Sequence, residues 1–105
     1  MADFQIVLST CGDHETAERI AHRLVEQRLA ACVNILPGVR SIYRWQDAVA
    51  SETEVLMIIK TTASLIEQVQ STLTSLHSYE IPEFLVLPIS GGSKSYLGWL
   101  EGSLG

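Results

Sequence analysis

The segment His77–Glu83 carries an imidazole, a phenol and two carboxylates between two apolar stretches. A neutral imidazole binds borderline divalent ions such as copper or zinc, and carboxylates bind cations or accept hydrogen bonds. Pro82 restricts the backbone shapes of this segment. Because binding groups gather on loops held by rigid elements, we expect a functional site here. The candidate side chains are those of His77, Tyr79, Glu80 and Glu83.

Cys11 is a second candidate metal ligand, because it follows an apolar run and precedes a turn at Gly12. Amides at a helix N-terminus near such a turn lower the pKa of a thiol, although Asp13 opposes this. One thiol and one imidazole are too few ligands for a closed structural site. An ion at Cys11 and His77 would therefore bind weakly or take further ligands from water or another subunit. The alternative is that His77 only caps the C-terminus of a helix.

Lys60 and Trp99 extend the candidate set to a polar and aromatic ligand pocket. Lys60 ends an apolar, β-rich run, and Trp99 lies near the C-terminus. Together with Tyr79, Glu80 and Glu83 they would line a ligand pocket if association of subunits brings them together. The alternative role of the two glutamates is structural, in loop capping and in salt bridges between subunits.

Motif and charge patterns exclude several function classes. The chain has no G-x-S-x-G, H-E-x-x-H, Walker or G-x-G-x-x-G motif, so we expect no enzyme. Its 105 residues include 12 acidic and 7 basic side chains, giving a net charge of −5. Phosphate backbones and anionic membranes would repel this surface, which argues against nucleic acid and membrane partners.

The compartment expected from the sequence is the cytoplasm. The first residues show no basic region followed by an apolar run, and no window approaches the roughly 18 apolar residues of a membrane span. Cys11 and Cys32 form no C-x-x-C pair, and a chain of this size folds without disulfides, so both thiols are expected to be reduced.

The elements that must position these residues follow the order strand, helix, strand, strand, helix, strand. Asp13 predicts the N-cap of the first helix, and Ser64–Glu67 predicts a capping box for the second. Pro37–Gly38 predicts a bulge or bend within a long second strand. The expected strands are 4–10, 31–45, a segment after Ala48 that ends at Lys60, and 84–89; the helices run from Asp13 towards Leu29 and from Ser64 to near His77, with a short helix around 96–100.

This order is the split βαβ arrangement, in which both helices cover one face of an antiparallel sheet. The sequence therefore predicts one α+β domain over residues 1–105. The central hairpin exceeds the usual strand length of about 5–6 residues and carries Ile42, Tyr43 and Trp45. Self-association is the simplest way to cover such apolar edges.

Several segments in a fixed order resemble the CutA family of divalent-cation-tolerance proteins. The resemblance implies a ferredoxin-like sandwich with a long hairpin, a short C-terminal helix and closure into a homotrimer similar to the PII signalling proteins. It also implies binding of copper or another divalent ion. The segments are Ala30–Asn34, Pro37–Gly38, Ser41–Trp45, Ile59–Thr61, His77–Glu83 and Tyr96–Leu100.

The chain departs from the family pattern at several positions. Ser78 stands where the family often has proline, and Asp47–Ala48 stands where it often has a Gly-Lys hairpin tip. Some relatives place a thiol at the position of Ser9 and an imidazole at that of Leu76. Cys11 lies two residues after Ser9 and would share its strand face, unless the turn at Gly12 changes the parity.

The leading hypothesis is a cytoplasmic homotrimer that binds divalent cations, copper first, and contributes to metal tolerance. Its candidate ligands are His77 and Cys11. One alternative is a PII-like signalling module that holds a small anionic ligand between subunits and acts on a protein partner. Another is an interaction scaffold in which metal binding is incidental.

Overall fold

A four-stranded antiparallel sheet in the order β2-β3-β1-β4 forms the centre of the computed structural model, which describes residues 2–105. This strand order and the helix positions confirm the α+β, ferredoxin-like prediction. The elements are β1 (Phe4–Cys11), α1 (His14–Glu26), β2 (Cys32–Trp45), β3 (Ala48–Thr62), the 3-10 turn η1 (Ala63–Leu65), α2 (Ile66–Leu76), β4 (Leu85–Pro88) and α3 (Lys94–Gly102).

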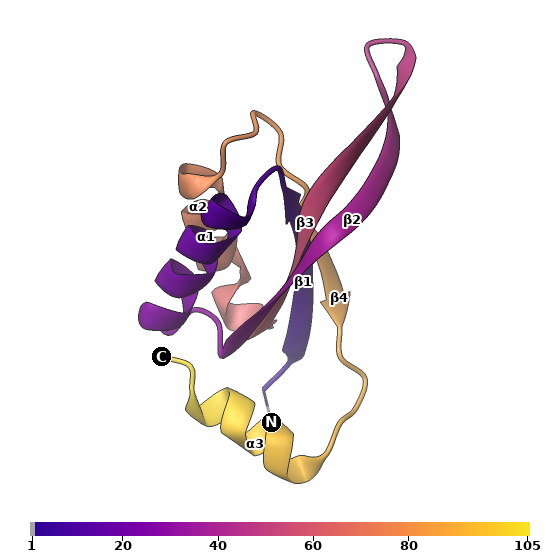
Figure 1. The fold of residues 1–105 in the computed structure, drawn as a ribbon. Helices are drawn as coiled ribbons and strands as arrows, with labels where there is room; N and C mark the ends of the chain where they lie inside the picture. The colour runs from indigo at the N-terminus through magenta and orange to yellow at the C-terminus, as the bar shows by residue number, and fades with distance from the viewer. Residues whose placement is uncertain (1) are drawn as a thin grey trace.

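Helices α1 and α2 lie side by side on one face of the sheet (Figure 1). Alternate residues of β1 and β3 face these helices, as the period of a strand requires. Val25, which the helical pattern placed in the core, is instead 43% exposed, because it lies at the side of the buried stripe of α1. The fully buried side chains of this core include Val7, Ile20, Leu24, Met57, Ile59, Val69 and Leu73.

Asp13 caps α1, as predicted. Its carboxylate accepts a hydrogen bond from the Thr16 amide at 2.7 Å and another from the Thr16 hydroxyl at 3.1 Å. These bonds hold the pKa of Asp13 below its ordinary value, because they stabilise the charged form. The turn after β1 is thereby tied to the first turn of α1.

Replacing Asp13 by alanine is expected to lower the midpoint of thermal unfolding at neutral pH, because the Thr16 amide loses its partner. A lowered pKa means that the charged cap stabilises the fold above the unfolded-state value and that this contribution is lost on acidification. The difference between wild type and Asp13→Ala should therefore shrink at low pH. Asp13→Asn, which keeps an acceptor without the charge, is the control; a constant difference across pH would contradict the assignment.

The predicted capping box at the start of the second helix is wrong. Residues 63–65 form η1, so α2 begins only at Ile66 and its cap position, Leu65, provides no side-chain acceptor. The Ser64 hydroxyl lies 3.3 Å from that of Thr62 instead of at a helix amide. The tighter 3-10 turn thus replaces the capping box.

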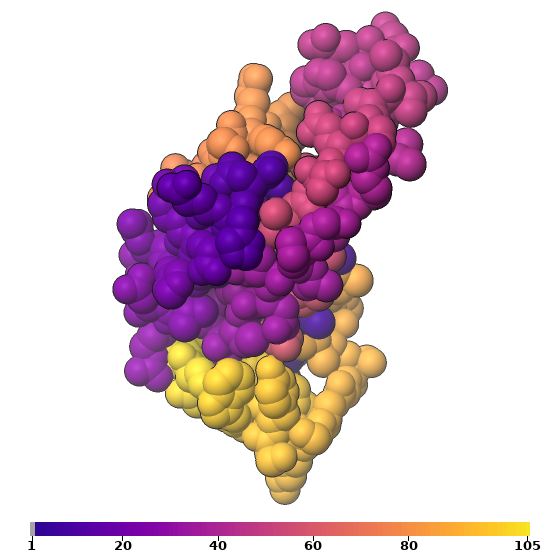
Figure 2. Space-filling model, in the orientation of Figure 1, coloured from indigo at the N-terminus to yellow at the C-terminus, as the bar shows by residue number. Residues whose placement is uncertain are grey.

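Strands β2 and β3 form a hairpin that extends beyond the body of the domain (Figures 1 and 2). The pairing register shifts between Leu36 and Val39, which confirms the predicted irregularity, and Gly38 has a φ of 75° that favours glycine. The tip consists of Gln46 and Asp47, both with positive φ, so Ala48 belongs to β3 and not to the tip. Two such residues match a tight hairpin turn.

The sheet face opposite α1 and α2, here called the open face, is rich in apolar side chains. Residues directly opposite in antiparallel pairs share a face, so Leu8 lies beside Ile58 on one side and Leu85 on the other. Helix α3 packs only at one end, where Leu100 contacts the cluster of Phe4 and Ala31. The apolar residues of the open face are Ile6, Leu8, Leu36, Leu56, Ile58, Leu85 and Leu87.

Candidate functional site

His77 is the cap residue at the C-terminus of α2 and lies against the C-terminal end of β1. Its Nε2 is 2.7 Å from the carbonyl oxygen of Thr10, and its Nδ1 accepts the backbone N–H of Tyr79 at 3.0 Å. Because a carbonyl only accepts, Nε2 must carry the proton and donate it. The ring is therefore held as one neutral tautomer with both nitrogens engaged.

Cys11 is fully buried and its thiol contacts the carbonyl oxygen of Asp13 at 3.4 Å. Burial raises the pKa of Cys11 above its ordinary value, because it penalises the thiolate more than a hydrogen bond from the backbone of Asp13 stabilises it. The lowering of the pKa by helix amides that the sequence suggested is thus outweighed. Cys11 is held in its protonated form in this protomer.

The structure brings His77 and Cys11 to the same end of β1, since the imidazole contacts the carbonyl of the preceding residue, Thr10. Cys11 still belongs to β1 and, like Ser9, is fully buried, so the turn at Gly12 does not change the parity. An ion here would have to displace the thiol proton and a hydrogen bond of the imidazole. The assignment of His77 and Cys11 as metal ligands stays a prediction.

Larger sets of metal-binding side chains are not assembled in the part of the protomer that the structure describes. Among residues 2–105, no group of three or more histidine, cysteine, aspartate or glutamate side chains is placed to hold an ion. Any site in this part of the chain therefore rests on pairs of ligands, with water or a second subunit completing the coordination.

One short polar contact of the α2–β4 loop was missed by the sequence analysis. The Tyr79 hydroxyl donates to Glu54 Oε2 at 2.6 Å, and Glu54 is only 7% exposed. Burial, this hydrogen bond and the negative charge of Glu54 raise the pKa of Tyr79 well above its ordinary value of 10.0. In the sequence, the only signal that Glu54 needs a buried partner is its position directly before the apolar run 55–59.

Gly12 allows the Tyr79 side chain to lie against the turn after β1. A Cβ atom at this position would lie 3.2 Å from the Tyr79 hydroxyl oxygen. The ring of Tyr79 also lies 4.7 Å, between centroids, from that of His77. Tyr79 therefore links the loop to both β1 and β3.

Glu80 and Glu83 are exposed, and their role in ligand binding stays a prediction. The contact that fixes Glu83, however, is made by its backbone, because its carbonyl accepts the Ser9 hydroxyl at 2.6 Å. Ser9 is thus a structural anchor of the loop.

Lys60 pairs with Ile6 near the start of β1, whereas the loop contacts Thr10 and Gly12 at the other end of that strand. Trp99 belongs to α3, which packs at the Lys60 end of the sheet. Lys60 Nζ is 3.4 Å from the Tyr96 hydroxyl, and the rings of Tyr96 and Trp99 are 5.4 Å apart. One protomer therefore does not bring Lys60 and Trp99 together with Tyr79, and only a neighbouring subunit would do so.

The fold defines the class as a ferredoxin-like α+β protein with an extended central hairpin. The family model of the CutA1 divalent ion tolerance protein matches residues 5–103. The chain belongs to this family. No helix within residues 2–105 has the length and apolar character needed to span a membrane.

Curated relatives and solved structures agree with this assignment. The divalent-cation tolerance protein CutA of Thermus thermophilus is 46% identical over 101 residues, which are 96% of this chain and 98% of the relative. The chloroplastic CutA of Arabidopsis thaliana is 44% identical over 93% of this chain, which spans 54% of that plant protein. The crystal structure of CutA from Xylella fastidiosa has a TM-score of 0.95 and 38% identity, with 99% of this chain and 100% of the other covered.

Proposed function

We propose that this protein is a homotrimer that binds divalent cations, copper first, and contributes to metal tolerance without catalysing a reaction. The observation that supports this function is membership of a divalent ion tolerance family over residues 5–103. Cys11 and Cys32 are both free thiols, which suits a reducing compartment such as the cytoplasm. The role within metal tolerance, the preferred ion and the compartment are parts of this proposal.

Two features of the protomer support self-association. The open face exposes Leu36, Leu85 and Leu87 by 40%, 56% and 44%. The sheet order leaves β2 and β4 as edge strands. One copy can therefore contact its neighbour through β2 while the neighbour uses β4. Contacts between unlike surfaces generate closed rings, and the family resemblance gives the number three.

Calorimetric titration with Cu(II) and Zn(II) tests metal binding, in parallel with His77→Ala and Cys11→Ser. If the two side chains are the ligands, we expect saturable binding near one ion per subunit in wild type and weaker binding in both variants. Even an outer-shell partner of a metal ligand typically contributes about 10–100-fold in affinity, so loss of a ligand should weaken binding at least tenfold. Circular dichroism of each variant controls for folding.

The absence of binding in wild type would overturn the cation-binding function and favour a signalling or scaffold trimer.

A small-ligand site that includes Tyr79, Lys60 and Trp99 requires a pocket between subunits, because one protomer places Tyr79 apart from the other two residues. Because Lys60 is cationic, the ligand suited to that end is an anion. A substitution of Lys60 that weakens binding of such a ligand, with the trimer intact, would support this second function.

A further inference from the structure

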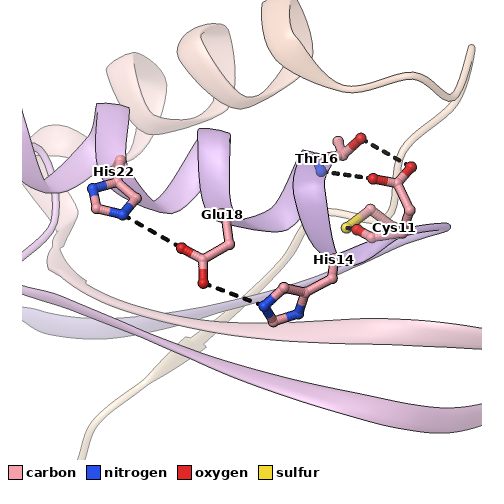
Figure 3. A network of polar contacts seen from close by, with 6 residues as sticks. Cys11, His14, Thr16, Glu18 and His22 are labelled. Carbon is pink, nitrogen blue, oxygen red and sulfur yellow. Dashed lines mark hydrogen bonds and ion pairs between the residues drawn. The ribbon is translucent and has the colours of Figure 1, made fainter.

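A row of three side chains on α1 carries metal-binding chemistry that lies outside the candidate site. His14, Glu18 and His22 follow one another at intervals of four residues, so they share one helix face. Their side chains are 59%, 46% and 73% exposed. Figure 3 shows the Glu18 carboxylate between the two imidazole rings.

The distances in this row are longer than hydrogen bonds. His14 Nε2 lies 3.3 Å from Glu18 Oε1, and His22 Nε2 lies 3.4 Å from Glu18 Oε2. Hydrogen bonds between nitrogen and oxygen are typically about 2.7–3.2 Å. Each imidazole nitrogen therefore faces one carboxylate oxygen across a slightly wider gap.

The same distances fit a tetrahedral ion between the two atoms. Zinc binds imidazole nitrogen at about 2.0–2.1 Å and carboxylate oxygen at about 2.0–2.2 Å, so a tetrahedral angle sets the nitrogen and oxygen roughly 3.4 Å apart. Octahedral or square arrangements, with angles near a right angle, would need a shorter separation. The separations in the row are therefore compatible with tetrahedral coordination by an ion such as Zn(II).

A single ion does not reach both histidines. His14 and His22 are eight residues apart, which is about 12 Å along the helix axis, and they face different oxygens of Glu18. Glu18 and His22 also line a groove of about 390 Å³ between α1 and β2, beside Val33 and Asn34. This groove leaves room for water in the remaining coordination positions.

We propose that Glu18, together with either His14 or His22, forms an open two-residue chelate for Zn(II) on the exposed face of α1. The proposal rests on the proposed divalent-cation function and gives it a second site, separate from His77 and Cys11. Two protein ligands completed by water make a weak, exchangeable site. The alternative is that the row contributes only two ordinary ion pairs between residues four apart on the helix.

The test is calorimetric titration of the whole protein with Zn(II), using wild type, the double variant His14→Gln/His22→Gln, and Glu18→Gln. Because these side chains are exposed, the variants should fold as wild type does, and circular dichroism checks this. We expect each variant to weaken Zn(II) binding at the α1 site by more than about tenfold, and either single histidine change to weaken it less. Glu67→Gln on α2, which removes an exposed carboxylate elsewhere, is the matched control and should leave binding unchanged.

Nitrogen-15 NMR locates the ion independently of affinity. Under the proposal, Zn(II) should shift amide resonances of residues 14–22 in wild type and leave them unshifted in the double variant. Zn(II) binding that is unaffected by the α1 variants but lost in His77→Ala would overturn the α1 site and leave the proposed function standing. A wild type that binds neither Zn(II) nor Cu(II) would overturn both.

Discussion

Replacing Leu85 and Leu87 together by aspartate is expected to convert the proposed trimer into monomers. The trimer would have a mass of about 35 kDa, three times the chain mass of 11.6 kDa. Both side chains belong to the open face and are about half exposed in the protomer, at 56% and 44%. The protomer therefore tolerates charge there. An interface that buries the open face does not, because an unpaired buried carboxylate is strongly unfavourable.

The size of this effect follows from the desolvation of two carboxylates per subunit. A penalty of only about 2.8 kcal/mol at each interface already weakens association about a hundredfold, since each 1.4 kcal/mol is tenfold. Light scattering after size-exclusion chromatography, at fixed protein concentration, measures the outcome. The circular dichroism spectrum should remain that of the folded protomer.

A control with the same chemistry is available on the other side of the molecule. Val25 on α1 is 43% exposed, almost the same as Leu87, but it lies on the helical layer and not on the open face. Val25→Asp should leave the trimer intact. If the Leu85 and Leu87 variant stays trimeric, or if Val25→Asp dissociates the trimer instead, the open face is not the interface.

The parts of this fold that could be predicted from sequence depend on neighbouring residues. The element order follows from local periodicity, and the Asp13 cap needs only Thr16, three residues away. The bulge at Pro37–Gly38 is equally local, because Pro37 lacks an amide hydrogen and Gly38 adopts a positive φ. The prediction of a capping box was wrong because a 3-10 turn forms over the residues where the α-helix was expected to begin.

The loop that carries the candidate site could be predicted from the sequence, but the contacts of its side chains could not. Its loop was identified by residue types, whereas its contacts join residues far apart in the chain. The His77 imidazole contacts a carbonyl 67 positions away, and Tyr79 donates to a carboxylate 25 positions away. Such contacts depend on strand register and on the path of the loop, which residue types alone do not determine.

Tyr79→Phe is expected to lower the free energy of unfolding by about 2–3 kcal/mol. The substitution keeps the ring but removes the donor to Glu54, whose side chain is 7% exposed and would lose its 2.6 Å partner. Hydrogen bonds to charged groups are typically worth about 1.5–3 kcal/mol, and leaving a buried acceptor unpaired adds to the loss. Urea unfolding at a fixed protein concentration measures the difference, since oligomer stability depends on concentration.

Tyr43→Phe provides a matched control, because the Tyr43 hydroxyl also donates to a carboxylate, Glu52 Oε1, at 2.7 Å. Within the protomer that pair is exposed, so water can replace the lost donor. We expect little change in stability from Tyr43→Phe. Equal losses for Tyr43 and Tyr79 would mean that burial of Glu54 does not set the effect.

Alkaline pH should remove the contribution of Tyr79 without any substitution. Its pKa is raised in the folded protein, chiefly by burial and then by Glu54, so above pH 10 the folded state binds more protons than the unfolded state. The free energy of unfolding of wild type then falls with rising pH, by up to about 1.4 kcal/mol per pH unit from this group. Below pH 10 the contribution is fully present. The difference in free energy of unfolding between wild type and Tyr79→Phe should therefore be constant below pH 10 and become smaller above it. A difference that stays constant at alkaline pH would show that the pKa of Tyr79 is not raised in the folded protein.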